Sequence, residues 1–149
     1  MKKLNWCLKQ NKGIKLIKPN NNLSESYIKD ADKTLENTKN IEGKWEIIMT
    51  YYACYNALYS VIIKAGIQSE IHDCTIELMN LFRFKKEQIE FMKELKEKRI
   101  KTQYYLEEIK LKSKKEVQEF ILNCKIILDD LSSKKIERIR EVIEAKLKK

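Results

Sequence analysis

Glycine and proline are scarce in this chain, and their scarcity restricts its fold more than any other feature. Only three glycines and one proline occur in 149 residues. Tight turns and helix stops depend on these two residues, because glycine reaches positive φ and proline cannot continue a helix. A chain with so few of them can build few turns, which favours a small number of long helices.

Apolar side chains recur at helical spacing through most of the sequence. They predict helices over residues 24–40, 44–65, 72–82 and 88–110, and a fifth from Ser113, whose stripe continues to Ile143. Ser113 and Glu116 have the spacing of a capping box, and Gly66 is a natural left-handed helix stop. Residues 1–22 are expected to be irregular, and no strand is predicted. The expected fold is all-α: a single domain over 1–149, an antiparallel bundle of four to five main helices.

The helix over 44–65 has apolar residues on two faces, which predicts a helix enclosed by its neighbours. Four of its tyrosines are closely spaced: Tyr51, Tyr52, Tyr55 and Tyr59. For the last three, packing between helices is the favoured interpretation, although tyrosines can also stack on bases or bind phosphates.

Charge is distributed unevenly along the chain, whose formal net charge is +9. Residues 1–18 contain six lysines and no acidic residue, and residues 85–149 are also basic. Lysine-rich ends can attract a polyanion, so generic nucleic-acid binding through them is one hypothesis. The plainer interpretation is that these lysines only solvate exposed helix faces.

The four cysteines are scattered, which favours free, buried thiols in a reducing cytosol. His72 and Cys74 are two residues apart, but a zinc site would need two further ligands from distant helices. We therefore expect no metal and no cofactor. No stretch has the length and apolarity of a membrane span, so the chain is expected to be cytoplasmic.

An arginine occupies an apolar seam in the helix over 88–110. The seam consists of Met92, Leu95, Arg99, Thr102, Leu106 and Ile109, which share one face. A guanidinium removed from water needs a partner charge or several acceptors. Arg99 is therefore either a phosphate-binding residue or a structural arginine paired with an acid on a facing helix.

Four other residues are candidates for the same site. Gln103, Tyr104 and Tyr105 follow Arg99 on its helix, and His72 is the only histidine. The ordinary pKa of histidine suits a general base at neutral pH. The alternative for His72 is a helix-entry residue that is hydrogen-bonded to the backbone or to Asp73.

The order of several segments resembles the HEPN superfamily, in particular a family of small, mostly uncharacterised archaeal and bacterial HEPN-domain proteins. The resemblance spans nearly the whole chain. It lies in residues 6–19 (WCLKQNKGIKLIKP), 45–67 (WEIIMTYYACYNALYSVIIKAGI), 70–76 (EIHDCTI) and 99–108 (RIKTQYYLEE).

The resemblance implies a helical bundle that forms a homodimer, with its arginine helices near the dimer cleft. Many HEPN proteins are metal-independent ribonucleases of toxin–antitoxin and defence systems, and others accompany a minimal nucleotidyltransferase. In the ribonucleases an arginine is followed four to six residues later by a histidine. Here Arg99 matches the arginine, but Tyr104 stands in place of the histidine.

The leading hypothesis is an HEPN-type module that binds a nucleotide or RNA phosphate through Arg99, Gln103 and Tyr105. It would be the toxin-like or partner half of a nucleotidyltransferase pair. If it cleaves RNA, Arg99 would stabilise the phosphorane while His72 or Tyr104 handles the proton. The rival is a non-catalytic dimerisation or protein-interaction module in which Arg99 forms a structural ion pair.

Overall fold

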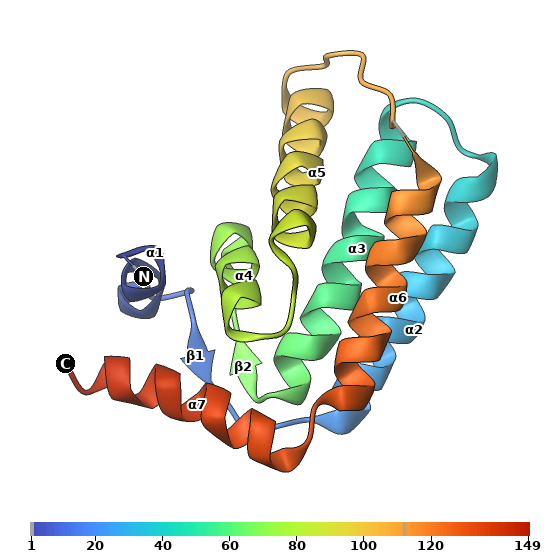
Figure 1. Cartoon of the computed structure of the whole chain (residues 1–149). Helices are drawn as coiled ribbons and strands as arrows, with labels where there is room; N and C mark the ends of the chain where they lie inside the picture. The colour runs from blue at the N-terminus through green and yellow to red at the C-terminus, as the bar shows by residue number, and fades with distance from the viewer. Residues whose placement is uncertain (1, 112) are drawn as a thin grey trace.

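The structure is a computed structural model that describes residues 2–111 and 113–149, and it confirms the all-α fold (Figure 1). Helix α3 (Lys44–Lys64) lies at the centre and contacts α2, α4, α5 and α6. The other helices have these bounds: α1 Lys2–Lys9, α2 Asn21–Asn37, α4 His72–Leu78, α5 Lys86–Tyr104, α6 Lys114–Asp130 and α7 Ser133–Leu147. Short 3₁₀ turns follow α2 (η1, Thr38–Asn40) and α4 (η2, Met79–Leu81). Every helix among the described residues is too short or too polar to span a lipid bilayer.

The central position of α3 follows from its sequence. Fourteen of its residues are buried, and they lie on both of the predicted apolar faces. Trp45 and Tyr52 are the residues of these faces that stay exposed. Ala53 and Ala57 are fully buried, and their small side chains let neighbouring helices approach closely. The helix ends before Gly66, whose φ of 73° confirms the predicted left-handed stop.

Several helix boundaries differ from the predicted ones. Helix α5 ends at Tyr104, so the last two members of the predicted seam, Leu106 and Ile109, lie beyond it. Leu106 has a φ of 54° and is 74% exposed. Helix α6 begins after Ser113 as expected, but the Ser113 side chain makes no capping hydrogen bond. Ser132 does cap α7, because its hydroxyl accepts a hydrogen bond from the Lys135 amide at 3.3 Å.

The prediction of an irregular segment over residues 1–22 is wrong for its first half. Helix α1 forms there and buries Leu4 and Cys7 against the bundle. A two-residue strand, β1 (Lys15–Leu16), then pairs antiparallel with β2 (Ile67–Gln68). This small sheet escapes sequence periodicity because two residues are too few to show alternation.

Arg140 of α7 joins three segments at the base of the bundle. Its Nη1 donates to the carbonyl oxygens of Ile17 at 2.8 Å and Gly66 at 2.7 Å, with a longer contact to that of Ala65 at 3.2 Å. The carbonyls at the C-terminal end of α3 have no partner within their own helix. The guanidinium supplies one and so fixes α7 across the base of the bundle (Figure 1).

Two of the four cysteines form a disulfide, so the expectation of four free thiols is wrong for Cys7 and Cys74. The bond joins α1 to α4, which are 67 residues apart in sequence. Cys54 and Cys124 are free and buried, as predicted, and burial raises the pKa of both thiols. The cytoplasmic expectation therefore loses the support it drew from the cysteines.

Candidate functional site

The predicted burial of Arg99 is confirmed: only 7% of the residue is exposed. It lies on the inner face of α5, toward α3, between Leu95 and Thr102, which are also buried. The guanidinium carbon lies 4.7 Å from the ring centroid of Tyr51 and 5.6 Å from that of Tyr52. Both distances allow an electrostatic attraction between the cation and the faces of the rings.

The hydrogen bonding of Arg99 is incomplete. Its Nη1 donates to the Tyr52 hydroxyl and to Gln103 Oε1, both at 3.3 Å. These lengths exceed the usual range for N–H···O bonds. Arg99 Nε is buried without an acceptor, and the residue forms no ion pair with any part of the described chain. The ion pair expected of a purely structural arginine is therefore not found within residues 2–111 and 113–149.

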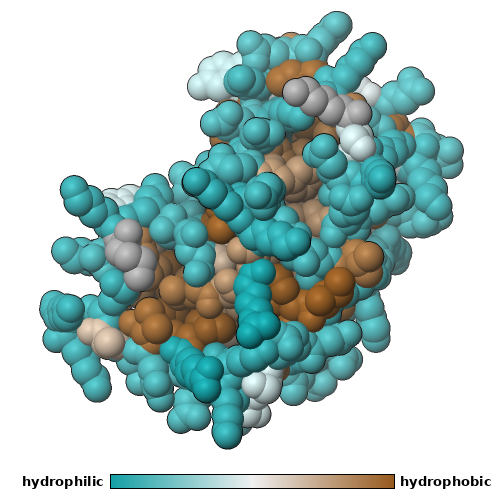
Figure 2. All heavy atoms as spheres, in the orientation of Figure 1, coloured by the Kyte–Doolittle hydropathy of each residue, from teal (hydrophilic) through white to brown (hydrophobic). Residues whose placement is uncertain are grey.

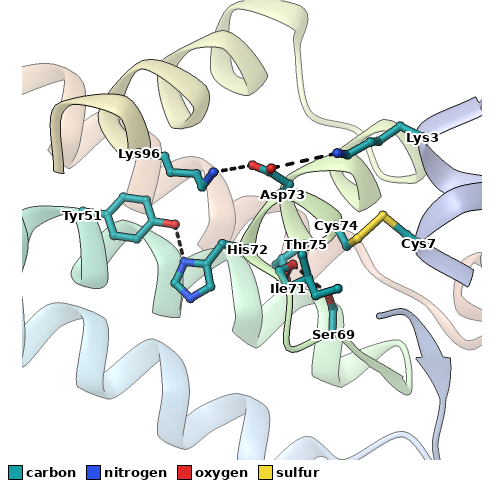
Figure 3. A network of polar contacts seen from close by, with 10 residues as sticks. All are labelled: Lys3, Cys7, Tyr51, Ser69, Ile71, His72, Asp73, Cys74, Thr75 and Lys96. Carbon is teal, nitrogen blue, oxygen red and sulfur yellow. Dashed lines mark hydrogen bonds and ion pairs between the residues drawn. A yellow bond between two sulfur atoms is a disulfide. The ribbon is translucent and has the colours of Figure 1, made fainter. Parts of the chain in front are cut away.

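His72 opens α4 and points toward α3 (Figure 3). Its Nδ1 lies 2.7 Å from the Tyr51 hydroxyl, and its ring stacks on Tyr55 with centroids 4.2 Å apart. Burial lowers the pKa of His72, and the positive charges of Arg99 and Lys96 lower it further. The imidazole is therefore neutral at pH 7, which is the state a general base needs.

Tyr51 connects the two candidate residues. Its ring lies under the Arg99 guanidinium, while its hydroxyl pairs with His72. Burial raises the pKa of Tyr51, so the hydroxyl stays protonated. It can donate to His72 Nδ1 or accept the Nδ1–H, according to the tautomer of the imidazole. His72 and Arg99 therefore belong to one cluster, although 27 positions separate them in sequence.

The predicted packing role of the tyrosines on α3 is confirmed for two of the three. Tyr55 and Tyr59 are each 8% exposed and stack with centroids 5.9 Å apart. The Tyr55 hydroxyl pairs with Thr75 Oγ1 at 2.9 Å, and the Tyr59 hydroxyl accepts the Ser69 amide at 3.1 Å. Tyr52 is 37% exposed, which leaves it available to a ligand.

An acidic residue with two basic partners lies beside the cluster. The Asp73 carboxylate is 2.5 Å from Lys96 Nζ on α5 and 3.9 Å from Lys3 Nζ on α1 (Figure 3). The Lys96 hydrogen bond, above all, lowers the pKa of Asp73. Asp73 pairs with lysines, and His72 pairs with Tyr51 instead of with its sequence neighbour, so the expected His72–Asp73 hydrogen bond is not found among the described residues.

The structure brings Arg99, Gln103 and His72 together but leaves the two following tyrosines outside. Tyr104 and Tyr105 are 65% and 71% exposed, because α5 ends there. Neither has a hydrogen bond or a ring contact to Arg99 among the described residues. Tyr51 and Tyr52 both contact the guanidinium, and neither was among the site residues predicted from the sequence.

The cluster retains exposed surface at Tyr52, Gln103 and the half-buried His72. A groove of about 690 Å³ runs between Thr102, the segment 106–111 and the start of α3, but Arg99 does not line it. Of the side chains around the guanidinium, Tyr52 and Gln103 are the ones that retain exposed surface. The described residues include no group of three side chains suited to a metal ion.

Comparisons of the chain with models of known protein families, with curated proteins and with solved structures gave no match.

Proposed function

We propose that the protein is an HEPN-type module that binds a phosphate of a nucleotide or RNA at Arg99. The supporting observation is a guanidinium that is 7% exposed, has a buried Nε without an acceptor and has no carboxylate partner among the described residues. Leaving such a donor unsatisfied is energetically unfavourable. A phosphate supplies both the negative charge and the paired oxygens that suit a guanidinium.

The ligand would approach on the side of Tyr52 and Gln103. Both accept from Arg99 at 3.3 Å, and long hydrogen bonds are the easiest to replace. An oxygen of the phosphate would take the place of one or both acceptors, and the displaced Tyr52 hydroxyl could then donate to the ligand. Tyr52 also offers an exposed ring on which a base can stack.

RNA cleavage is the catalytic form of this proposal. A 2′-hydroxyl would attack the adjacent phosphorus while His72 Nε2 accepts its proton, in the tautomer whose Nδ1–H donates to the Tyr51 hydroxyl. Arg99 would stabilise the charge of the phosphorane. The bond from phosphorus to the 5′-oxygen would then break, and the imidazolium would return the proton to that leaving oxygen. The lowered pKa of His72 and its place in the Arg99 cluster favour it over Tyr104, which is exposed at the end of α5. Binding is the primary proposal, because the distance between His72 and the phosphate depends on how the ligand lies in the site.

A homodimer is part of the proposal, with a minimal nucleotidyltransferase as the further partner that the resemblance implies. Exposed apolar residues support an interface near the end of α5: Tyr104, Tyr105 and Leu106 are consecutive and each at least 65% exposed. A run of this kind is unfavourable in water and is often covered by another chain. The same run is also what the rival interaction module would use.

The test replaces Arg99 with methionine, which preserves length and apolar contact but removes the charge and the donors. Lys101→Met is the matched control, because Lys101 is exposed on the same helix. Binding of uridine and adenosine monophosphates is measured by titration calorimetry. Loss of charge-assisted hydrogen bonds predicts at least about tenfold weaker binding for Arg99→Met and less than about twofold for Lys101→Met. Equal affinity of the Arg99 variant and the unmodified protein would reject the proposal.

A further inference from the structure

The two lysine-rich ends of the sequence lie together in the fold. Helix α1 and the C-terminal end of α7 are neighbours (Figure 1), and residues of both line one cavity of about 350 Å³. Lys9 lines it from α1, while Lys146 and Lys149 line it from the end of α7. The remaining lining residues, Asn5, Leu8 and Leu147, are uncharged.

The positive charge of this surface is not neutralised within the described chain. Nine ion pairs are found there, and none involves Lys9, Lys146 or Lys149. Elsewhere lysines of η1, α5 and α6 pair with acids one turn away. Like charges held close together without partners repel each other, and a polyanion would relieve that repulsion.

An exposed aromatic ring lies on α1 three positions before Lys9. Trp6 of α1 is 45% exposed, and Lys3 Nζ lies 4.8 Å from its ring centroid. The side chains that α1 buries are Leu4 and Cys7, so Trp6 is not needed to anchor this helix. The disulfide to Cys74 and the Lys3–Asp73 ion pair hold α1 in place (Figure 3).

The apolar surface beside the lysines distinguishes between two kinds of polyanion, an anionic membrane and a nucleic acid. A helix that binds a membrane surface presents a continuous apolar face to the lipid. The apolar face of α1 is turned into the protein. The exposed large apolar side chains are Trp6 on α1 and Leu147 of the cavity lining. The space-filling view shows an area of apolar atoms in the hollow at the lower left of the molecule, bordered by hydrophilic side chains (Figure 2). Single-stranded nucleic acids instead bind through cationic grooves and single stacked rings.

We propose that the surface formed by Trp6, Lys9, Lys146 and Lys149 binds the backbone of a single-stranded nucleic acid, with one base stacked on Trp6. This site is separate from Arg99 and does not depend on it. Through Asp73, which contacts both Lys3 and Lys96, α1 lies next to the Arg99 cluster.

The test uses a fluorescein-labelled oligouridine of about twelve nucleotides, a length within the usual site size. Binding is followed by anisotropy between roughly 50 and 200 mM salt. The variant Lys9→Gln/Lys146→Gln/Lys149→Gln is compared with Lys39→Gln/Lys93→Gln/Lys115→Gln, an equal charge change at exposed lysines elsewhere. Three lost phosphate contacts predict that the slope of log K against log salt falls by about 2 in the first variant only.

Trp6→Ala should weaken binding about tenfold, and Trp6→Phe should restore most of it because a ring is retained. The triple lysine variant should lower the slope by the same amount when Arg99 is already replaced by methionine, which separates failure here from failure of the Arg99 proposal. Equal losses in the two lysine variants would overturn the inference, as would a Trp6→Ala variant with normal affinity. It would also be overturned if the surface bound phosphatidylglycerol vesicles and not the oligonucleotide.

Discussion

At the scale of single residues, Arg99 combines burial with unsatisfied hydrogen bonding. A guanidinium with an unbonded Nε and two hydrogen bonds of 3.3 Å receives little in return for leaving water. Its contacts with the Tyr51 and Tyr52 rings compensate only in part. A group that weakens the fold in this way is more readily explained by a ligand than by stability.

Arg99→Met should therefore leave the protein at least as stable as before. The variant removes a poorly satisfied buried charge and keeps an apolar side chain of similar length, so the free energy of unfolding is expected to stay equal or to rise by about 1 kcal/mol. Urea denaturation provides the measurement. A fall of about 2 kcal/mol or more would instead identify Arg99 as a structural residue, as the rival interaction module requires.

His72 should make stability depend on pH. The lowered pKa means that the unfolded chain binds a proton more readily than the folded one. The contribution is complete above the ordinary histidine pKa of about 6.5 and is lost as pH falls through the lower folded value. Denaturation between about pH 7.5 and 5 should show this decline, and His72→Asn should remove that part of it. The lowered pKa of Asp73 stabilises the fold at pH values above the ordinary carboxylate pKa, and this contribution is lost only at more acidic pH than the His72 contribution.

Sequence periodicity could identify Arg99 but not its surroundings. The three- and four-residue steps through Leu95, Arg99 and Thr102 predict one buried face whatever that face meets. The Tyr51–His72 pair depends instead on the path of residues 65–71, which returns the chain from the end of α3 to the start of α4. Such a path is set by Gly66, the small sheet and Arg140 acting together, so no local pattern encodes it.

At the scale of elements, the contact between Arg140 and the end of α3 requires glycine at position 66. A Cβ there would lie 2.6 Å from the Ile17 carbonyl oxygen and would also collide with Arg140 Nη1. The positive φ of 73° is unfavourable for alanine as well. The carboxyl end of α3, the β1 segment and α7 therefore meet at a point with no room for a side chain.

Gly66→Ala should lower the free energy of unfolding by roughly 2–4 kcal/mol, through the backbone conformation and the collision together. Arg140→Ala is the partner variant, because it removes one of the colliding atoms. The double variant should lose less stability than the sum of the two single ones, which marks residues in direct contact. Strict additivity would contradict the contact.

The Cys7–Cys74 disulfide also stabilises the arrangement of the helices, because it joins α1 to α4. Its closed loop spans 67 residues, so removing it should cost about 2–4 kcal/mol by the loop-entropy model. Cys7→Ala/Cys74→Ala should lower the urea midpoint accordingly. Reducing agent should destabilise the unmodified protein and leave this variant unchanged. Under non-reducing denaturation, alkylation should modify Cys54 and Cys124 but neither Cys7 nor Cys74. Labelling of all four would contradict the bond.

The sequence predicts that the main helices form, but it predicts neither the residues at which they end nor the disulfide. Helix α3 has apolar residues at helical spacing on two faces, a pattern that is not found in a strand. Helix α1 has two buried residues, which is too little pattern to distinguish it from a loop. The Cys7–Cys74 bond requires the approach of α1 to α4, which is a property of the tertiary fold.

At the scale of the whole molecule, burial decreases from the centre to the two ends. Helix α3 is surrounded by α2, α5 and α6, while α1 buries Leu4 and Cys7 and α7 buries Ile139 and Ile143. Local stability follows the number of buried apolar contacts. The central helix therefore opens only when the whole domain unfolds.

Native-state hydrogen exchange should follow this order. Amides of α3 between Tyr51 and Val61 should exchange slowest, with a free energy equal to that of global unfolding. Amides of α7 should exchange faster, and those of α1 faster still once Cys7 and Cys74 are reduced. Mass spectrometry of peptic fragments reads all three helices in one experiment. Uniform protection across the chain would contradict the expected order.

Arg140 also bears on how the polypeptide folds as it is synthesised. Its contacts reach back 123 residues to Ile17 and 74 to Gly66, and contacts between such distant positions form late because large loops must close first. The ribosome will have released α1 through α6 before this guanidinium emerges. Until then the carbonyl groups that Arg140 contacts remain hydrated. A nascent chain interrupted before residue 140 lacks these contacts and leaves the C-terminal end of α3 accessible to chaperones and proteases.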